Sequence, residues 1–255
     1  MEADLMQLAA TGVLCLGRVS GLLVCSPVLG SSAVSAPAKA SLALAVALLV
    51  YPAFTANALP VRSGSILATT LSEFAVGAAI GLAAQLVFEG VQLAGQTMGL
   101  QMGLSLATVF DPTSNADSPV IATLVQMLAT LMFLALNAHV FLLRAVANSY
   151  VWLPPGAELR WAAFAEWGSR AVGGVLNAGV QLAAPVVLAT MCVDVVLGIA
   201  GKASPQLPVL LLGISVKAVV GLGVLLVSLR FWPDLISHQM ENAMGAVERL
   251  LHAVH

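Results

Sequence analysis

Five ionisable residues lie inside otherwise apolar stretches of this 255-residue chain: Arg18, Glu73, Glu89, Asp194 and Lys217. An ionisable group at the centre of a bilayer costs about 3 kcal/mol on insertion scales, so it normally faces the protein interior or water. Two interpretations follow. The charges either line a path for an ion or substrate, or they form buried pairs and helix-end groups that hold an assembly together.

Buried pairing is the interpretation that the spacing favours. None of the three carboxylates has a second acidic residue at helical spacing. We expect Arg18 to pair with Glu73, because both lie deep in neighbouring apolar blocks. If they do pair, reversing the charge at Glu73 abolishes assembly and a second reversal at Arg18 restores it.

The sequence contains no recognisable catalytic constellation. Gly198-Ile-Ala-Gly201-Lys202 is only loosely like a phosphate-binding loop, because its glycine spacing is wrong and neither serine nor threonine follows the lysine. His139 stands alone in an apolar run, where a histidine is more often a buried hydrogen-bonding residue than a ligand. The sequence has neither a serine nucleophile elbow nor a metal-type cluster. We therefore expect no enzyme activity, no cofactor and no metal site.

Glycines recur at helical spacing between residues 77 and 103. Gly77 and Gly81 form one G-x-x-x-G pattern, and Gly95, Gly99 and Gly103 form two more in series. Residues four apart share a helix face, and glycine there lets a second backbone approach closely. Nearby glutamine amides need partners once they leave water; these are Gln85, Gln92, Gln96 and Gln101. The pattern predicts a helix that packs tightly against other helices or lines a wet passage, with ordinary intramolecular packing as the alternative.

The composition indicates a membrane protein. Hydrophobic residues make up 60% of the chain and charged residues only 9%, whereas about a quarter of a soluble domain is charged. So few charged residues are not enough to form a water-facing surface. The surface must therefore face lipid or other apolar protein. The net charge of −2 and the lack of a basic run argue against nucleic-acid binding. Three scattered cysteines in apolar stretches predict buried free thiols.

Apolar blocks that could form helices alternate with polar breaks. A spanning helix needs roughly 20 mainly apolar residues. The blocks cover residues 5–26, 41–59, 66–110, 119–143, 171–200 and 206–231. One crossing per block would give six spans, and the third block is long enough to hold a seventh helix. We expect a single integral membrane domain over residues 1–255, with an interfacial loop over 150–170 that could hold a short amphipathic helix, and an amphipathic tail helix over 234–255.

One stretch is similar to the signature of the FliR family of flagellar type III export proteins: Ala94-Gly-Gln-Thr-Met-Gly-Leu-Gln-Met-Gly-Leu-Ser-Leu-Ala-Thr-Val-Phe-Asp-Pro112. In that family a glycine-rich helix runs into an Asp-Pro turn. The similarity covers nearly the whole chain, and its other matching positions are Arg18, Pro27, Pro37, Pro52, Glu73-x3-Gly77-x3-Gly81, Leu134–His139, Leu153–Gly156, Leu197-Gly198 and Lys202–Leu207. Three positions depart from the family pattern, namely Lys39, Glu89 and Ser215.

The resemblance implies an all-α polytopic membrane protein of about six to seven hydrophobic helices, arranged as hairpins within a hetero-oligomeric helical export gate. In that family one chain joins several FliP and FliQ subunits around a narrow channel for unfolded flagellar proteins. FlhB docks around the gate, and FlhA and the ATPase couple energy elsewhere. The implied location is the bacterial inner membrane, in the flagellar basal body. Buried charges would then be shielded by neighbouring subunits.

By the same resemblance, one loop projects into the channel and plugs it in the closed state. Its residues are Phe110, Asp111, Pro112, Thr113, Ser114, Asn115, Ala116, Asp117 and Ser118. A turn bearing Phe110 can fill a narrow apolar bore and move aside, and the adaptable side chains of Met98 and Met102 suit sealing around varied cargo.

Two other functions stay open on the sequence. One is the homologous subunit of an injectisome, and the other is a secondary transporter for a small solute. Transporters share intramembrane charges and broken helices but often carry internal repeats. The pentapeptide Gly90-Val-Gln-Leu-Ala94 recurs as Gly179-Val-Gln-Leu-Ala183, but its flanks diverge at once, so we interpret the recurrence as coincidence.

Overall fold

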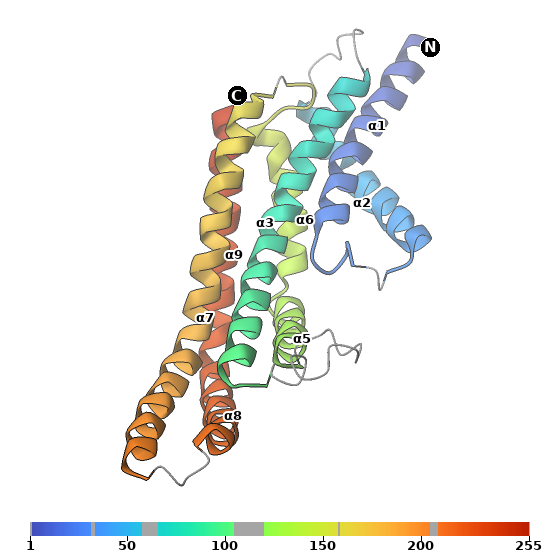
Figure 1. Cartoon of the computed structure of the whole chain (residues 1–255). Coiled ribbons are helices and arrows are strands. Elements are labelled where there is room, and N and C mark those ends of the chain that lie inside the picture. The colour runs from blue at the N-terminus through green and yellow to red at the C-terminus, as the bar shows by residue number, and fades with distance from the viewer. Residues whose placement is uncertain are drawn as a thin grey trace. The chain divides into compact units, whose positions relative to one another are not determined.

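The computed structural model of the protein describes residues 2–31, 34–57, 66–104, 120–157, 159–204 and 209–254. All regular secondary structure among these residues is helical. The helices are α1 (Glu2–Cys25), α2 (Ala36–Asn57), α3 (Ile66–Gln101), α5 (Val120–Ala135), α6 (Ala138–Trp152), α7 (Trp161–Ala203), α8 (Val209–Ser228) and α9 (Trp232–Val254) (Figure 1). A short 3-10 turn, Leu229–Phe231, joins the last two. The all-α prediction is confirmed.

Three helical segments among the described residues are long and apolar enough to cross a membrane: α3, α7 and Leu212–Ala253. The pair α5 and α6, broken at Leu136 and Asn137, makes a fourth if it counts as one span. Asn137 marks this break, because its φ of 54° is left-handed. Shorter apolar helical segments lie in α1 and α2. By length and composition, the described helices thus offer three or four candidate spans, against the six that one crossing per apolar block would give.

The long helices exceed the thickness of a bilayer. At 1.5 Å per residue, the 36 residues of α3 and the 43 residues of α7 extend about 54 and 64 Å, against about 30 Å for the hydrocarbon core. Residues 66–101 form one helix, so no second helix begins among them. The loop expected over 150–170 is shorter, because α6 continues to Trp152 and α7 begins at Trp161.

The amphipathic helix at the C-terminus continues directly from α8 through the 3-10 turn instead of standing apart as a tail. Its buried face carries Ile236, Met240, Met244, Val247 and Leu251. Its exposed face carries Asp234, His238, Glu241 and Arg249. The buried positions recur every three or four residues, which is the spacing of one helix face, so α9 is amphipathic.

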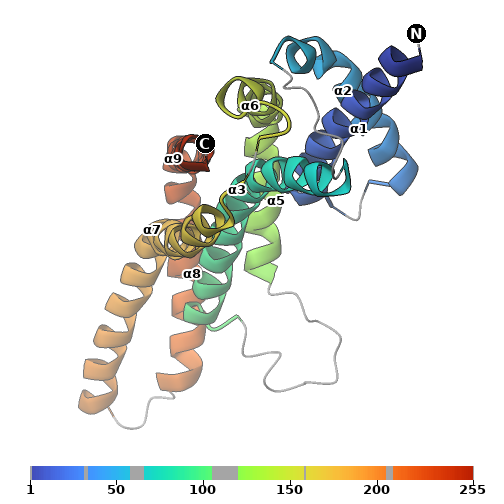
Figure 2. The same cartoon turned by 90° about the horizontal axis from the view of Figure 1, so that it is seen from above.

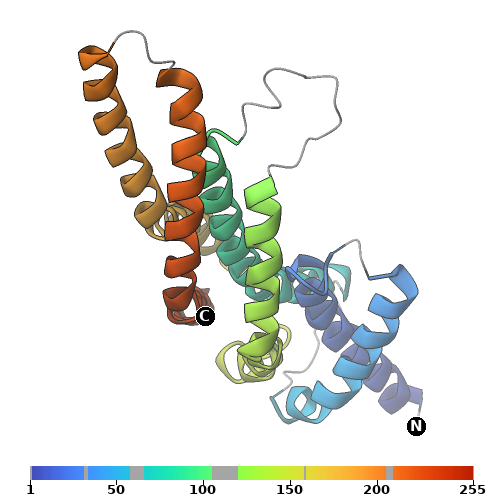
Figure 3. The same ribbon diagram turned by 90° about the horizontal axis from the view of Figure 1, so that it is seen from below.

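The chain divides into two compact units. The first comprises Met1–Leu86, Asn137–Val172 and Met240–His255, and the second comprises Val87–Leu136 and Gly173–Gln239. In the first unit, α1 packs against α2, and both contact α6 (Figure 2). In the second unit, the later parts of α3 and α7 lie with α5 and α8, and α7 runs beside α8 (Figure 3).

Candidate functional site: a buried ion pair and close helix contacts

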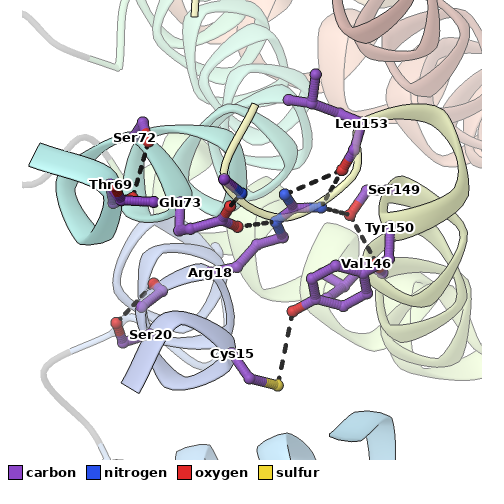
Figure 4. A network of polar contacts seen from close by, with 12 residues as sticks. Cys15, Arg18, Ser20, Thr69, Ser72, Glu73, Val146, Ser149, Tyr150 and Leu153 are labelled. Atoms are coloured by element: carbon purple, nitrogen blue, oxygen red, sulfur yellow. Dashed lines mark hydrogen bonds and ion pairs between the residues drawn. The ribbon is translucent and has the colours of Figure 1, made fainter. Parts of the chain in front are cut away.

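Arg18 and Glu73 form an ion pair inside the first unit. Arg18 Nε donates a hydrogen bond to Glu73 Oε2 at 2.7 Å. The arginine comes from α1 and the carboxylate from α3 (Figure 4). Their side chains are 0% and 4% exposed, so water takes almost no part in the contact. Two of the five ionisable residues that the sequence singled out therefore lie together.

The end of α6 and the turn after it provide the other partners of the guanidinium group. Arg18 Nη1 donates to Ser149 Oγ at 3.0 Å, and Nη1 and Nη2 donate to the carbonyl oxygen of Leu153 at 3.3 and 3.2 Å. The Tyr150 ring completes the cage as a cation–π partner, with its centroid 4.2 Å from Arg18 Cζ. A buried charge is tolerable only when it is paired and hydrogen-bonded in this way.

Glu73 holds the same turn through its second oxygen. The backbone N–H of Gly156 donates to Glu73 Oε1 at 3.0 Å. The turn has this shape because Leu153 precedes a proline and is extended, which ends α6, and because Gly156 adopts a φ of +85° that glycine tolerates. The ion pair therefore joins α1, α3 and the turn at residues 153–156.

Cys15 extends this network to α2. Its Sγ lies 3.8 Å from the Tyr150 hydroxyl and donates to the carbonyl oxygen of Ala47 at 3.5 Å. All three cysteines are free, as the sequence predicted, but only Cys15 is buried, because Cys25 is half-buried and Cys192 is exposed. Four helices of the first unit thus meet around one set of polar contacts.

Glycines bring the backbones of α1 and α3 together beside the ion pair. A Cβ atom at Gly77 would collide with the carbonyl oxygen of Arg18, and one at Gly81 would lie 2.6 Å from that of Leu22. Both glycines of the first G-x-x-x-G pattern therefore lie in this helix contact, where only a hydrogen atom fits.

A second glycine pair on α1 faces the first pair. A Cβ at Gly21 would collide with the carbonyl oxygen of Phe74, and one at Gly17 would lie 3.3 Å from that of Thr70. Sequence reasoning missed this pair, although Gly17 and Gly21 show the same four-residue spacing. The two patterns interlock, so each helix fills the groove that the other leaves.

Close contacts also organise the second unit. A Cβ at Gly95 would lie 2.6 Å from Ala122 Cα of α5, and the rings of Phe88 and Phe133 meet edge to face along the same pair of helices. Gly99 is buried within α3. The glycine-rich face of α3 therefore packs within the chain at Gly95.

The two copies of the repeated pentapeptide contact each other. A Cβ at Gly179 of α7 would lie 3.2 Å from the carbonyl oxygen of Gly90 of α3, and 2.9 Å from Leu93 Cδ2. The first residue of each copy is thus a glycine that allows the close approach of α3 and α7. The recurrence therefore marks one helix contact, whatever its origin.

Gly103 has a different role from the one expected of it. α3 ends at Gln101, and Gly103 follows with a φ of +77°. Its N–H donates to the carbonyl of Leu100 at 3.0 Å, and the N–H of Leu104 donates to that of Gly99 at 3.1 Å. These two bonds define a Schellman motif, which closes the helix and satisfies its last carbonyls. Gly103 therefore ends the helix instead of extending its packing face.

Replacing Gly103 with alanine is expected to destabilise the chain by about 1–2 kcal/mol, because a Cβ disfavours the left-handed conformation. The nearest side chain, Ile214, lies at an ordinary 3.4 Å, so the effect is conformational and not steric. Gly103→Asn should lose less stability, because asparagine tolerates the left-handed conformation better than alanine does. Thermal unfolding of the protein in membranes checks this, with Gly198→Ala as the control, since a Cβ there meets no described atom within 4 Å. Equal stability of Gly103→Ala and Gly198→Ala would contradict the prediction.

Three of the five ionisable residues are not buried in the way the sequence suggested. Glu89 is exposed. Asp194 Oδ1 and Lys217 Nζ form an ion pair at 2.5 Å, but their side chains are 45% and 23% exposed. The correction has a simple cause. An apolar sequence does not distinguish the inward face of a helix from the outward one, and these three residues lie nearer the outer surface of the second unit.

The residues proposed for the channel have two different outcomes. The plug loop, Phe110–Ser118, lies outside the described residues. Met98 and Met102 are both fully buried, and a Cβ at Gly221 of α8 would lie 2.7 Å from Met102 Cγ. The two methionines thus pack inside the chain. A sealing role stays a prediction, and it requires a movement that exposes them.

The outward faces of the chain are strongly apolar. The most apolar window of α3 is 67% buried, whereas the corresponding windows of α7 and of Leu212–Ala253 are each only 22% buried. Among the described residues, no group of three His, Cys, Asp or Glu side chains is placed to hold a metal ion. An all-α chain with its best-buried charges paired inside and apolar helices outside is an integral membrane protein.

Comparison with known proteins identifies the family. The family described as "Bacterial export proteins, family 1" matches residues 9–243. The flagellar biosynthetic protein FliR of Escherichia coli K12 is 32% identical over 82% of this chain and 80% of its own length. FliR of Pectobacterium carotovorum is 31% identical over 92% of this chain and 90% of its own length. FliR of Bacillus subtilis 168 is 29% identical over 82% of this chain and 82% of its own length. This chain belongs to the FliR family of bacterial export proteins.

Proposed function

We propose that this chain is a non-catalytic channel and scaffold subunit of the flagellar type III protein export gate. It would assemble with FliP-like and FliQ-like subunits into the pore for unfolded flagellar proteins, beside FlhB-like and FlhA-like components. Its place would be the inner membrane, in the flagellar basal body. Membership of the export family, and relatives that are flagellar biosynthetic proteins, support a role in flagellar export.

The extent of apolar surface on α7 supports the need for protein partners. Exposed apolar side chains run from Val172 to Ile199, which are 59% and 68% exposed. These residues lie about 40 Å apart along the helix, more than the roughly 30 Å of the hydrocarbon core. Lipid alone therefore leaves part of this face in water unless the helix tilts strongly. Other apolar subunits would cover the remainder, which is what a hetero-oligomeric gate supplies.

Deletion and purification together test this function. A strain that lacks the chain should form no flagella and should not swim, and the restored chain should correct both. The tagged chain should co-purify with FliP-like and FliQ-like proteins and should be unstable alone. A motile deletion strain, or a stable solute-binding monomer, would overturn the proposal. Loss of effector secretion with normal motility would instead identify an injectisome subunit.

Deleting residues 111–118 is expected to leave assembly intact but to let ions and small molecules leak across the membrane, because these residues would fill the closed channel. Ion flux into membrane vesicles measures the leak, with the full-length chain as the control. Co-purification of the FliP-like and FliQ-like partners establishes that the shortened chain assembles. Unchanged permeability in an assembled complex would rule out a plug at this loop.

A further inference from the structure

One outward face of α3 in the second unit carries three polar side chains, and Leu100, one turn further along this side, is 68% exposed. Glu89, Gln92 and Gln96 are all exposed, and their spacing of three and four residues puts them on one side of the helix. Gly90 and Gly95 lie in the contacts that α3 makes with α7 and α5. The polar residues thus occupy a side that these neighbours leave open.

The outward face of α5, in the same unit, has the opposite character. Leu124, Met127 and Leu131 are 42%, 63% and 63% exposed and recur at the same helical spacing. Such a face suits lipid or an apolar partner. The contrast is informative because α3 is as apolar as a membrane-spanning helix requires, yet its open face carries a carboxylate and two amides.

Lipid is a poor environment for this face. A carboxylate at the bilayer centre costs about 2.5–3.5 kcal/mol on insertion scales, and an amide without a partner there costs several more. A dry protein interface is also unfavourable. Interface cores are depleted in glutamate, and ordering each long Glu or Gln side chain costs up to about 2 kcal/mol of rotamer entropy. Water avoids both costs.

We propose that the face formed by Glu89, Gln92 and Gln96 borders the water-filled passage and contacts the polypeptide in transit. The proposal rests on the function proposed above and names the surface that performs it. A glutamine amide both donates and accepts hydrogen bonds, so it can exchange partners with the backbone of any extended chain, whatever its sequence. Glu89 adds a negative charge that favours basic segments and small cations near this wall.

Thiol labelling tests the proposal on the native complex. The variants Gln92→Cys and Gln96→Cys are made in a Cys192→Ala chain, because Cys192 is the exposed native thiol. Methanethiosulfonate ethylsulfonate, which does not cross membranes, is added to both sides of opened membranes. Both thiols should react at least about tenfold faster than Met127→Cys and Leu131→Cys on α5, because the reactive thiolate forms readily only where water reaches. Two positions are used so that the loss of one variant leaves the test intact.

The second measurement is export itself. Modifying Gln92→Cys or Gln96→Cys with a bulky maleimide should slow export of flagellar protein at least about tenfold, since the adduct narrows the passage; the α5 variants should export at the parental rate. Labelling no faster than at Leu131→Cys would show a dry face and overturn the proposal. Fast labelling with normal export would show a wet face off the path and would overturn it too. Export that is normal without the chain would instead overturn the proposed function.

Discussion

Replacing Glu73 with glutamine is expected to remove most of the folded chain from the membrane. The substitution keeps the size of the side chain but leaves the guanidinium of Arg18, which is 0% exposed, without its counter-charge. Removing one partner of a buried pair typically destabilises a protein by about 3–5 kcal/mol, because the remaining charge stays desolvated. Protease resistance and the steady-state level of the tagged chain measure the effect.

The pair formed by Arg170 and Glu166 is the matched control. Their contact is 2.6 Å, but the side chains are 77% and 64% exposed. Glu166→Gln should therefore change stability by less than about 0.5 kcal/mol. Equal effects at Glu73 and Glu166 would show that burial does not make the first pair important.

Exchanging the two charges refines this test. Glu73→Arg alone should abolish assembly, because it puts two buried cations together. Adding Arg18→Glu restores the pair, but the new carboxylate would face the carbonyl oxygen of Leu153, which now accepts two hydrogen bonds. We therefore expect partial recovery of the chain level. No recovery at all would argue against direct pairing.

Gly77→Ala is expected to have the second-largest effect. The added methyl group would collide with the carbonyl oxygen of Arg18, which belongs to backbone and cannot rotate away. α1 and α3 must then separate beside the ion pair. Overpacking of this kind costs about 1–3 kcal/mol and occasionally more, so the temperature of unfolding in membranes should fall clearly.

Gly173→Ala provides the comparison for this substitution. A Cβ at Gly173 of α7 meets no described atom within 4 Å. Alanine is favoured over glycine within a helix by about 0.5–1 kcal/mol, so this variant should be neutral or slightly more stable. A Gly77→Ala chain as stable as Gly173→Ala would mean that α1 and α3 do not approach closely in the membrane.

Amino-acid type alone was enough to single out those residues of the site that are rare in apolar sequence. A charge such as Arg18 or Glu73 must find a partner when it is buried, and two glycines four residues apart indicate a close helix contact. The pairing partner and the faces of Gly77 and Gly81 could therefore be foreseen from local patterns. The facing pair, Gly17 and Gly21, carries the same signal and could have been found.

Other features depend on tertiary structure and leave no such trace. The carbonyl of Leu153 and the N–H of Gly156 are backbone groups. Every residue has such groups, so the amino-acid types at these positions do not indicate that they bind the ion pair. Glu89 and Asp194 could not be assigned to an outward face, because the nearly uniform apolar helices around them show little one-sided pattern. Helix ends were also misplaced: α7 already begins at Trp161, inside the stretch expected to be a loop, and at Trp232 the chain stays helical where polar residues suggested a break.

The order in which Arg18 meets its partners affects how the chain is made. Glu73 follows it by 55 residues, whereas Ser149 and Leu153 follow by 131 and 135. A ribosome that adds about 5–20 residues per second needs on the order of ten seconds to supply the later partners. During that time the Nη1 and Nη2 donors of Arg18 do not yet have the acceptors that Ser149 and Leu153 later supply. The set of hydrogen bonds around Arg18 can therefore be completed only after the turn that follows α6 has been synthesised.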